Sequence, residues 1–198
     1  MKYFRKILMD PPAVRILCML LRNSSLVLEY GSGASTILFS QFVKEWWSIE
    51  HDRTWGELIR YEMDQVGYKD RIALEVVVPD SPYQRKIGSN MKRTINRNGR
   101  FRLGKNNDGT SEEFKSYIAS PSAYMRQFDV IINDGRARVA VANGVLREQL
   151  LVDGGIMMMH DWERREYKAV LGVGRFKVWK EDDSQERQTA FLIPYDAA

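Results

Sequence analysis

The chain has 198 residues and is 44% hydrophobic, which predicts one globular domain, residues 1–198, with room for a full core. Its single cysteine, Cys18, excludes an intramolecular disulfide and favours a reducing compartment, so a cytoplasmic protein is expected. The net charge of +4 is local, because residues 84–106 hold eight Lys and Arg and no acid, which leaves the rest of the chain acidic.

The first segment, residues 1–25, is expected to form a helical cap on one edge of a sheet. Its helix begins near Pro11-Pro12, because proline is favoured in the first turn of a helix. A lid over a substrate is the alternative. The apolar run from Ile16 to Leu21 is too short for an export signal or a membrane span, so no association with a membrane is expected.

A buried strand, a glycine turn and a helix start follow one another after residue 25. Leu26 to Leu28 is a short apolar run, Gly31-Ser32-Gly33 interrupts it, and apolar residues recur at helical spacing from Ile37 to Val43. In an open α/β sheet this arrangement binds a nucleotide-like ligand, because glycines let the backbone approach it. Thr36 stands where the dinucleotide pattern needs its last glycine, which disfavours a hydride-transferring oxidoreductase.

Glu29-Tyr30-Gly31-Ser32-Gly33, with an acid two places before the first glycine, resembles the first motif of the class I S-adenosylmethionine-dependent methyltransferases. The resemblance implies that S-adenosylmethionine is the cofactor. The residues that it assigns to cofactor binding in this stretch are Glu29, Tyr30, Gly31, Ser32, Gly33, Ser35 and Thr36.

A second strand is expected at Glu45 to Ile49 and ends in Glu50-His51-Asp52. Glu50 lies nineteen residues after Gly31. In a βαβ unit this spacing brings an acid beside the ribose of the ligand. By resemblance, Glu50 is assigned to the ribose and His51 to the edge of the adenine. The alternatives are a helix cap for Glu50, although Asp52 is the better cap, and a surface loop position for His51.

An amphipathic helix over residues 53–66 and a third strand from Arg71 to Val78 come next. The helix is expected to turn Trp55, Leu58, Ile59 and Met63 inward. Asp80, just past the strand, is a candidate for the adenine amino group by resemblance, and a turn-forming aspartate is the alternative.

Residues 81–127 form a basic insertion, longer than the usual connection, with a short helix expected around Ser111 to Ala119. The insertion is read as a solvated loop, as a lid, or as a patch for an anionic substrate. Nucleic acid is disfavoured, because only Phe101 within the basic run offers a ring for base stacking.

The remaining elements complete a class I plan of five β-α units and a closing hairpin. Strands are expected at Phe128 to Asn133 and Ile156 to Met159, helices at 137–151 and 163–172, and a hairpin from Phe176 to Pro194. The fold class is therefore α/β: a Rossmann-like, doubly wound, mostly parallel sheet of about seven strands with helices on both faces. Asp134-Gly135-Arg136, with His160-Asp161 and Arg164, resembles a bacterial methyltransferase-like subgroup that identifies no substrate.

Asp134, His160 and Asp161 are the candidate catalytic residues, because they follow strands whose ends are neighbours at the carboxyl edge of the sheet. Asp134 is also a candidate for cofactor binding. Three readings remain open: a divalent metal site, a metal-free acid/base site with His160 as base, and structural hydrogen bonding. Catechol-type O-methyltransferases place an Asp-Asn pair where this chain has His160-Asp161, a departure that puts magnesium in doubt.

Arg136 and Arg138 either pair with local carboxylates or anchor an anionic substrate. The function expected from all these residues is methylation of oxygen in a small hydroxylated or anionic metabolite. The alternatives are an RNA or protein methyltransferase that docks through the basic insertion, and a binding module without turnover. An amino-nitrogen acceptor is disfavoured, because Asp134-Gly135 stands where such enzymes carry an Asn/Asp-Pro-Pro-Tyr/Phe motif.

Overall fold

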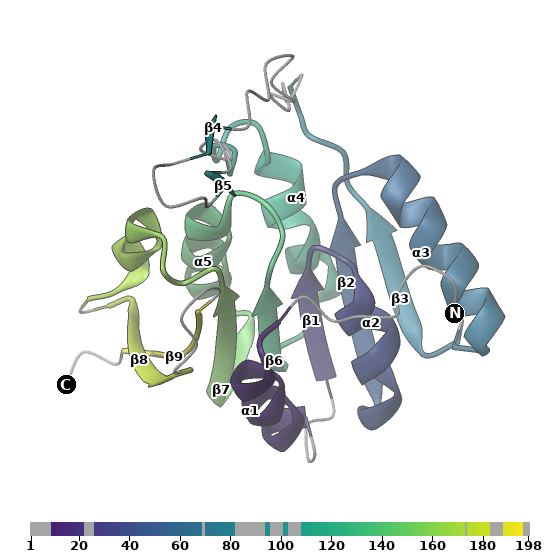
Figure 1. Cartoon of the computed structure of the whole chain (residues 1–198), viewed down its shortest axis with the longest axis horizontal. Helices are drawn as coiled ribbons and strands as arrows, with labels where there is room; N and C mark the ends of the chain where they lie inside the picture. Colours follow the sequence, from purple (N-terminus) through teal and green to yellow (C-terminus); the bar gives the residue numbers. More distant parts are fainter. Residues whose placement is uncertain are drawn as a thin grey trace.

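The computed structural model describes residues 9–21, 26–68, 70–81, 94–95, 101–102, 108–172, 174–182 and 188–195. Its main sheet has seven strands in the order β3-β2-β1-β6-β7-β9-β8 (Figure 1). These strands are β1 (Leu26–Tyr30), β2 (Glu45–Glu50), β3 (Ile72–Val76), β6 (Phe128–Asn133), β7 (Leu151–His160), β8 (Phe176–Glu181) and β9 (Thr189–Pro194). Neighbours from β3 to β7 pair in parallel, and β9 runs antiparallel to β7 and β8. The expected sheet with its C-terminal antiparallel hairpin is confirmed.

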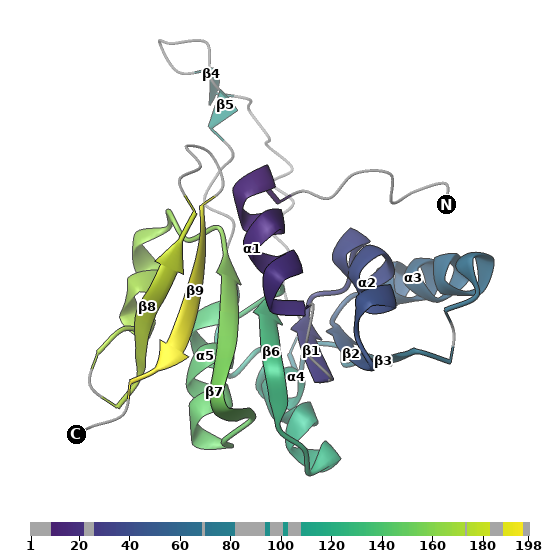
Figure 2. The same ribbon diagram turned by 90° about the horizontal axis from the view of Figure 1, so that it is seen from below.

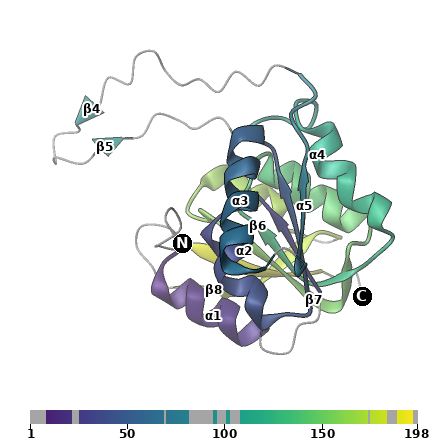
Figure 3. The ribbon, with the colours of Figure 1, turned by 90° about the vertical axis from the view of Figure 1, so that its right-hand side faces the viewer.

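Helices cover both faces of the sheet, as the edge-on view of Figure 3 shows. The face with α1, α2 and α3 is opposite to the face with α4, α5 and the 3-10 helix η3. These elements are α1 (Pro11–Leu21), α2 (Ala34–Phe39), α3 (Arg53–Val66), α4 (Lys115–Ala119), α5 (Arg138–Arg147) and η3 (Arg165–Val170). Two further 3-10 helices, η1 (Ser40–Phe42) and η2 (Ser120–Tyr124), continue α2 and α4. None of the helices in the described ranges is long and apolar enough to cross a membrane.

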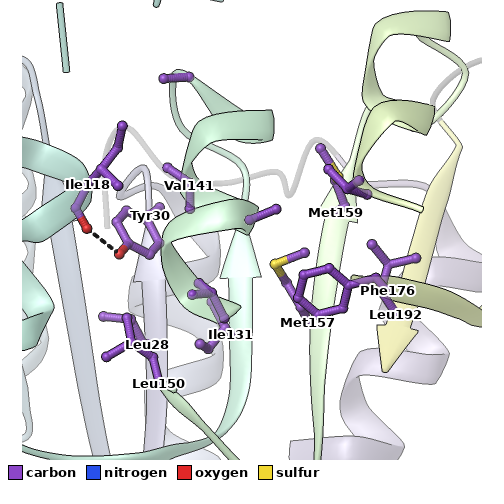
Figure 4. Packing of buried hydrophobic residues seen from close by; sticks show 14 of the residues in the cluster. Leu28, Tyr30, Ile118, Ile131, Val141, Leu150, Met157, Met159, Phe176 and Leu192 are labelled. Carbon is purple, nitrogen blue, oxygen red and sulfur yellow. Dashed lines mark hydrogen bonds between the residues drawn. The ribbon is translucent and has the colours of Figure 1, made fainter. Parts of the chain in front are cut away.

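Each face of the sheet has its own core, because successive side chains of a strand point to opposite sides. In β1, Val27 packs in the core on the α1 side and Leu28 in the core on the α5 side. Both are fully buried, which explains why the parallel strands read as continuous apolar runs. Figure 4 shows the second core, in which the hydroxyl of Tyr30 donates to the carbonyl oxygen of Ile118 over 3.1 Å.

The N-terminal helix covers the middle of one face rather than the sheet edge that was expected. Ala13 and Leu17 of α1 are fully buried and share a core with Val130 and Met158, which lie on two central strands. Figures 1 and 2 show α1 lying across these strands. The expected start near Pro11 is confirmed, whereas residues 1–8 and 22–25 of the expected cap lie outside the described residues.

Several element boundaries differ from the expected ranges. The helix expected at 137–151 ends at Arg147, and β7 begins at Leu151, five residues before the expected strand. Gly154 and Gly155 lie inside β7, where its pairing with β6 shifts register. The helix expected at 163–172 is only the short 3-10 helix η3.

Residues 82–93, 96–100 and 103–107 of the basic insertion lie outside the described residues. The backbone of the remaining part forms a two-stranded antiparallel pair, β4 (Thr94–Ile95) with β5 (Phe101–Arg102). The predictions that concern this basic segment therefore stay predictions. Asp80, just before the insertion, and Asp108, within it, make contacts at the carboxyl edge of the sheet that are given below.

Candidate active site

The glycine turn after β1 is in backbone contact with the loop that follows β6. Gly31 has a φ of +91°, a conformation that favours glycine, and a Cβ placed there would lie 2.6 Å from Cα of Gly135. The N–H of Gly31 donates to the carbonyl of Ile49 over 2.8 Å, and the N–H of Asp134 donates to the carbonyl of Tyr30 over 3.0 Å. The ends of β1, β2 and β6 thus form one continuous edge, where the sequence placed the donor site.

Glu29 lies beneath the glycine turn and is fully buried. Its carboxylate accepts hydrogen bonds from four side chains, namely Ser35, Thr36, Trp46 and Ser48. Burial raises the pKa of Glu29 to about 7, although these hydrogen bonds act in the opposite direction. All four partners are protein side chains, so the contacts of Glu29 support the shape of the turn.

Hydrogen bonds with side chains of α2 and β2 also hold the turn residues themselves. The Thr36 hydroxyl accepts from the N–H of Gly33 over 2.8 Å while it donates to Glu29, and the hydroxyls of Ser32 and Ser48 lie 2.8 Å apart. Thr36, the residue that departs from the dinucleotide pattern, thus bonds to the N-cap residue of α2 and stabilises the start of this helix. The conformation of the turn is set by these side chains before any ligand binds.

Glu50 reaches the glycine turn from the end of β2, as its spacing from Gly31 predicted. Its carboxylate is 2% exposed, accepts from the N–H of Ser32 over 2.9 Å on one oxygen, and accepts from the N–H groups of His51 and Asp52 on the other. The capping alternative for Glu50 is wrong, because the Asp52 carboxylate caps α3 by accepting from the N–H of Trp55 over 3.0 Å. The assignment of Glu50 to the ribose stays a prediction.

His51 lies between Glu50 and two aromatic side chains of the opposite face. Its Nδ1 is 2.8 Å from Oε1 of Glu50, and its ring meets those of Phe114 and Tyr117 edge-on at 5.8 and 6.2 Å. His51 therefore packs with aromatic side chains beside Glu50, the residue assigned to the ribose, and is not an isolated surface residue. This position is compatible with its assignment to the adenine edge.

Asp80 anchors the start of α4. Its carboxylate accepts from the N–H and the hydroxyl of Ser116, and its own N–H donates to the carbonyl of Glu113 over 2.9 Å. The hydroxyl hydrogen bond of Ser116 is the main reason that the pKa of Asp80 is lowered. These contacts favour a structural role for Asp80 over a contact with the adenine. The partner of Asp80, Ser116, lies on α4 and not within a local turn.

The sequence patterns did not identify Tyr117, which lies near the turn, and they placed Trp55 in the core. Tyr117 is fully buried, and its hydroxyl would lie 2.1 Å from a Cβ on Gly135, which explains why a glycine follows Asp134. Trp55 was expected to point inward, but its side chain is 40% exposed and its indole N–H donates to the carbonyl of Ser32 over 2.8 Å. Helical spacing alone did not reveal that the glycine turn, and not the core, is the partner of Trp55.

The three candidate catalytic residues come together at the ends of β6 and β7. Oδ1 of Asp134 lies 2.9 Å from Nδ1 of His160, and Oδ1 of Asp161 lies 3.8 Å from the same nitrogen. His160 is almost fully buried, whereas the side chains of Asp134 and Asp161 are 28% and 16% exposed. The predicted convergence is therefore present.

The charge of His160 depends on these carboxylates. Burial by itself would lower the pKa of His160, but Asp134, through its charge and hydrogen bond, and Asp161 outweigh burial and raise it. With Nδ1 facing a carboxylate, the proton of the neutral ring belongs on Nδ1, and Nε2 is left as the basic nitrogen. This arrangement is the one that a general base requires.

Arg138 lies between the two carboxylates and is 6% exposed. Its guanidinium contacts Oδ1 of Asp134 at 3.0 Å and Oδ2 of Asp161 at 3.1 Å, and it also donates to the carbonyls of Gly135 and His160. Arg164 adds a second cation, 2.8 Å from Oδ2 of Asp161. Of the two alternatives for Arg138, pairing with local carboxylates is confirmed.

This cluster does not fit a divalent metal. The guanidinium of Arg138 supplies positive charge between Asp134 and Asp161, where the metal alternative needs the cation. Among the residues that the structure describes, no group of three or more His, Cys, Asp or Glu side chains could hold a metal ion. The metal reading of Asp134, His160 and Asp161 is therefore not carried further.

Asp108, within the insertion, is a residue of this cluster that the sequence did not indicate. Its carboxylate accepts from the N–H of Arg138 over 2.8 Å, and its carbonyl accepts from the N–H of Ala137 over 2.6 Å. Asp108 thereby caps α5 from a distant part of the chain and holds the insertion against the Arg138 cluster. A capping partner 30 residues away leaves no local signal.

Comparison with known proteins shows what this architecture is similar to. No protein-family model matches the chain, and no curated protein matches its sequence. A methyltransferase-like protein from Silicibacter pomeroyi is similar in structure, with a TM-score of 0.60, 20% identity, and coverage of 98% of this chain and 92% of the other. An S-adenosylhomocysteine-bound methyltransferase from Podospora anserina gives a TM-score of 0.58 at 14% identity, covering 91% and 76% of the two chains.

An rRNA methylase from Streptococcus thermophilus is also similar, with a TM-score of 0.57, 10% identity, and coverage of 96% and 99% of the two chains. One of these three proteins is named for an RNA acceptor, and identities this low establish the fold and not the substrate. The chain has the Rossmann-like fold of the class I S-adenosylmethionine-dependent methyltransferases.

Proposed function

We propose that the chain is an S-adenosylmethionine-dependent methyltransferase that methylates a hydroxyl oxygen of a small hydroxylated or anionic metabolite. The observation that carries the proposal is the Asp134–His160 pair, with Oδ1 and Nδ1 2.9 Å apart. It lies on the same carboxyl edge as the glycine turn, since Asp134 and Gly135 contact Tyr30 and Gly31 directly. A donor-binding turn beside an oriented base is what methylation of a hydroxyl needs.

The residues of the turn fit the donor. Gly31 and Gly135 let the two loops meet at backbone distance, and the hydroxyl of Tyr117 occupies the space beside Gly135. Glu50 is proposed to hold the ribose hydroxyls and His51 to face the adenine. A carboxylate oxygen has two lone-pair sites, and Oε2 of Glu50 uses one of them for the N–H of Ser32.

When bound, S-adenosylmethionine supplies a methyl group on a positively charged sulfur. The protein then has to hold the acceptor in line and take its proton. His160 is the proposed base, and Asp134 orients its ring and stabilises the charge that the ring gains. Asp161, held by Arg138 and Arg164, contributes a second negative charge near the same ring.

The alternative acceptors are RNA and protein, reached through the basic insertion. That alternative rests on residues 84–106, most of which lie outside the described part of the chain. The Asp134–His160 pair favours a hydroxyl acceptor, because a hydroxyl has a proton that a base must remove. A binding module without turnover would have no use for an oriented base.

Calorimetry with S-adenosylhomocysteine and with NAD tests the donor assignment. We expect S-adenosylhomocysteine to bind and NAD to give no heat, because Thr36 occupies the position of the third dinucleotide glycine. Transfer of a labelled methyl group to a panel of catechols and polyols, with total RNA in a parallel reaction, tests the acceptor. Binding of NAD alone would contradict the proposed cofactor, and labelling of RNA alone would contradict the small-molecule acceptor.

A further inference from the structure

A second buried polar side chain lies opposite His160 on the neighbouring strand. The antiparallel register of β7 and β9 pairs His160 with Thr189. Side chains that are paired in this way share one face of the sheet, with Cβ atoms about 4.5–5.5 Å apart. His160 is 4% exposed and Thr189 is fully buried, so both lie at the protected end of the two strands.

Each of these side chains has one polar atom without a partner. Within the described part of the chain, neither Nε2 of His160 nor Oγ1 of Thr189 makes a hydrogen bond, and both atoms are buried. Buried polar atoms in folded proteins are nearly always paired, because leaving them unpaired costs free energy. Two unpaired atoms on a directly opposite pair of residues therefore point to a polar group that binds between them.

The pair faces the side of the sheet on which the donor-binding carboxylates lie. Met158 and Phe191, two residues from His160 and Thr189, belong to the core that contains Val27 and Trp46. By the same two-residue alternation, Glu29 and Glu50 point to this side of β1 and β2. The carboxylates at the donor turn and the His160–Thr189 pair thus lie on the same side of the sheet at its carboxyl edge.

Hydrogen-bond chemistry selects the group that fits. The Asp134 carboxylate keeps the proton of neutral His160 on Nδ1, so Nε2 accepts a hydrogen bond, while the Thr189 hydroxyl can donate one. A neutral hydroxyl satisfies both atoms with a single oxygen, because it donates to Nε2 and accepts from Oγ1. A carboxylate has no proton to give to Nε2, and an ammonium, which could donate to both atoms, has no lone pair with which to take the methyl group.

We propose that the reacting hydroxyl of the methyl acceptor binds between Nε2 of His160 and Oγ1 of Thr189, an inference that rests on the proposed function. In the reaction the hydroxyl proton moves to Nε2 and the oxygen forms a bond to the methyl carbon. The bond from that carbon to sulfur breaks, and its electron pair stays on the sulfur, which leaves neutral S-adenosylhomocysteine. Thr189 positions the oxygen, and the imidazolium of His160 later releases the proton to solvent.

The test uses the full chain saturated with S-adenosylhomocysteine and labelled with ¹⁵N-histidine. The chain has only two histidines, so a His51→Gln variant assigns the two sets of ring signals. The probes are catechol and myo-inositol, each paired with its fully O-methylated ether. We expect at least one hydroxyl probe to shift the Nε2 signal of His160 and its ether to leave that signal unchanged.

Two substitutions at residue 189 separate a positioning role from a structural one. Thr189→Val removes the hydroxyl at nearly constant shape and is expected to weaken the effective probe about 3- to 10-fold, while Thr189→Ser keeps near wild-type affinity. In the absence of probe, Thr189→Val is expected not to lower the melting temperature, because the hydroxyl that it removes has no partner within the described chain. A purely structural hydroxyl would give the opposite pattern, with lower stability and unchanged probe affinity.

The outcomes also separate this inference from the proposed function. Failure of S-adenosylhomocysteine to bind would overturn the proposed function itself. Binding of S-adenosylhomocysteine with no shift of Nε2 by either hydroxyl probe would overturn only the acceptor position. A shift that Thr189→Val does not weaken would assign the pair to a buried water and would also overturn it.

Discussion

The proposed donor side and the proposed acceptor side of the same sheet edge differ in how their buried polar groups are satisfied. On the donor side, both oxygens of Glu29 and of Glu50 accept hydrogen bonds from the turn and its neighbours. On the acceptor side, Nδ1 of His160 is held by Asp134, whereas within the described chain Nε2 and the Thr189 hydroxyl have no partner. The donor turn is thus shaped before binding, and the acceptor side leaves atoms for a ligand to satisfy.

The largest effect is expected on the acceptor side, from Asp134→Asn. This change removes the charge that orients His160 and raises its pKa, so methyl transfer is expected to fall by about 10²–10⁴-fold. Binding of S-adenosylhomocysteine is expected to stay within about twofold, because the Asp134 side chain does not hold the turn. Initial rates with labelled donor, together with calorimetry, check both parts.

The same variant sharpens the comparison through the pH profile. The proposed mechanism requires neutral His160, so the wild-type rate is expected to rise as the pH increases through the raised pKa of this residue. In Asp134→Asn the burial of His160 dominates, and the midpoint is expected to move to lower pH. An unchanged midpoint would contradict the role of Asp134 as the partner that sets the charge of His160.

On the donor side, Glu29 is expected to make stability depend on pH. Its folded pKa of about 7 lies above the ordinary value of 4.5, so its favourable contribution is present below 4.5 and lost as the pH rises through 7. At about 1.4 kcal/mol per pH unit of pKa shift, the loss amounts to about 3 kcal/mol. Glu29→Gln is expected to remove this dependence, whereas Glu57→Gln, at an exposed site on α3, serves as the matched control.

Urea unfolding of the wild type and both variants between pH 4.5 and pH 8 measures this effect. His160 also has a raised pKa and contributes in the same direction, so the difference between wild type and Glu29→Gln isolates Glu29. Parallel pH curves for wild type and Glu29→Gln would mean that the buried carboxylate does not titrate between these limits.

Glu50→Ala is expected to weaken S-adenosylhomocysteine at least about tenfold. One charge-assisted hydrogen bond from the ribose to the remaining lone-pair site of Oε2, worth about 1.5–3 kcal/mol, is lost, and about 1.4 kcal/mol corresponds to one factor of ten. The change also frees the N–H of Ser32, so Glu50→Gln is included to keep the shape of the site. Unchanged affinity in an intact fold, measured by calorimetry, would exclude the ribose assignment.

The smallest expected effect comes from Trp55→Phe, which loses the indole hydrogen bond to the carbonyl of Ser32. One neutral hydrogen bond at a half-exposed site is expected to change the affinity for S-adenosylhomocysteine about threefold. Trp179→Phe, at an exposed position on the edge strand β8, is the matched control and is expected to have no effect. Equal affinities for the two variants would show that the turn keeps its shape without Trp55.

Local sequence patterns determined the elements and the edge at which the site lies. Glycines after an apolar run located the turn, the spacing of Glu50 from Gly31 placed an acid beside it, and the acids that follow β6 and β7 marked the second half of the site. These signals are reliable because parallel strands bring their carboxyl ends to one edge whatever the intervening segments contain. The position of Asp52 at the start of α3 was likewise readable, since a cap acts within its own turn.

Only the tertiary structure decided which side chains meet across that edge. Arg138 lies between the carboxylates of Asp134 and Asp161, Asp108 caps α5 from within the insertion, and Thr189 faces His160. None of these contacts follows from a periodicity, because each depends on strand register or on where a long connection returns. The sequence thus determined where chemistry is placed, whereas the packing of distant segments determined which atoms are paired and which are left for a ligand.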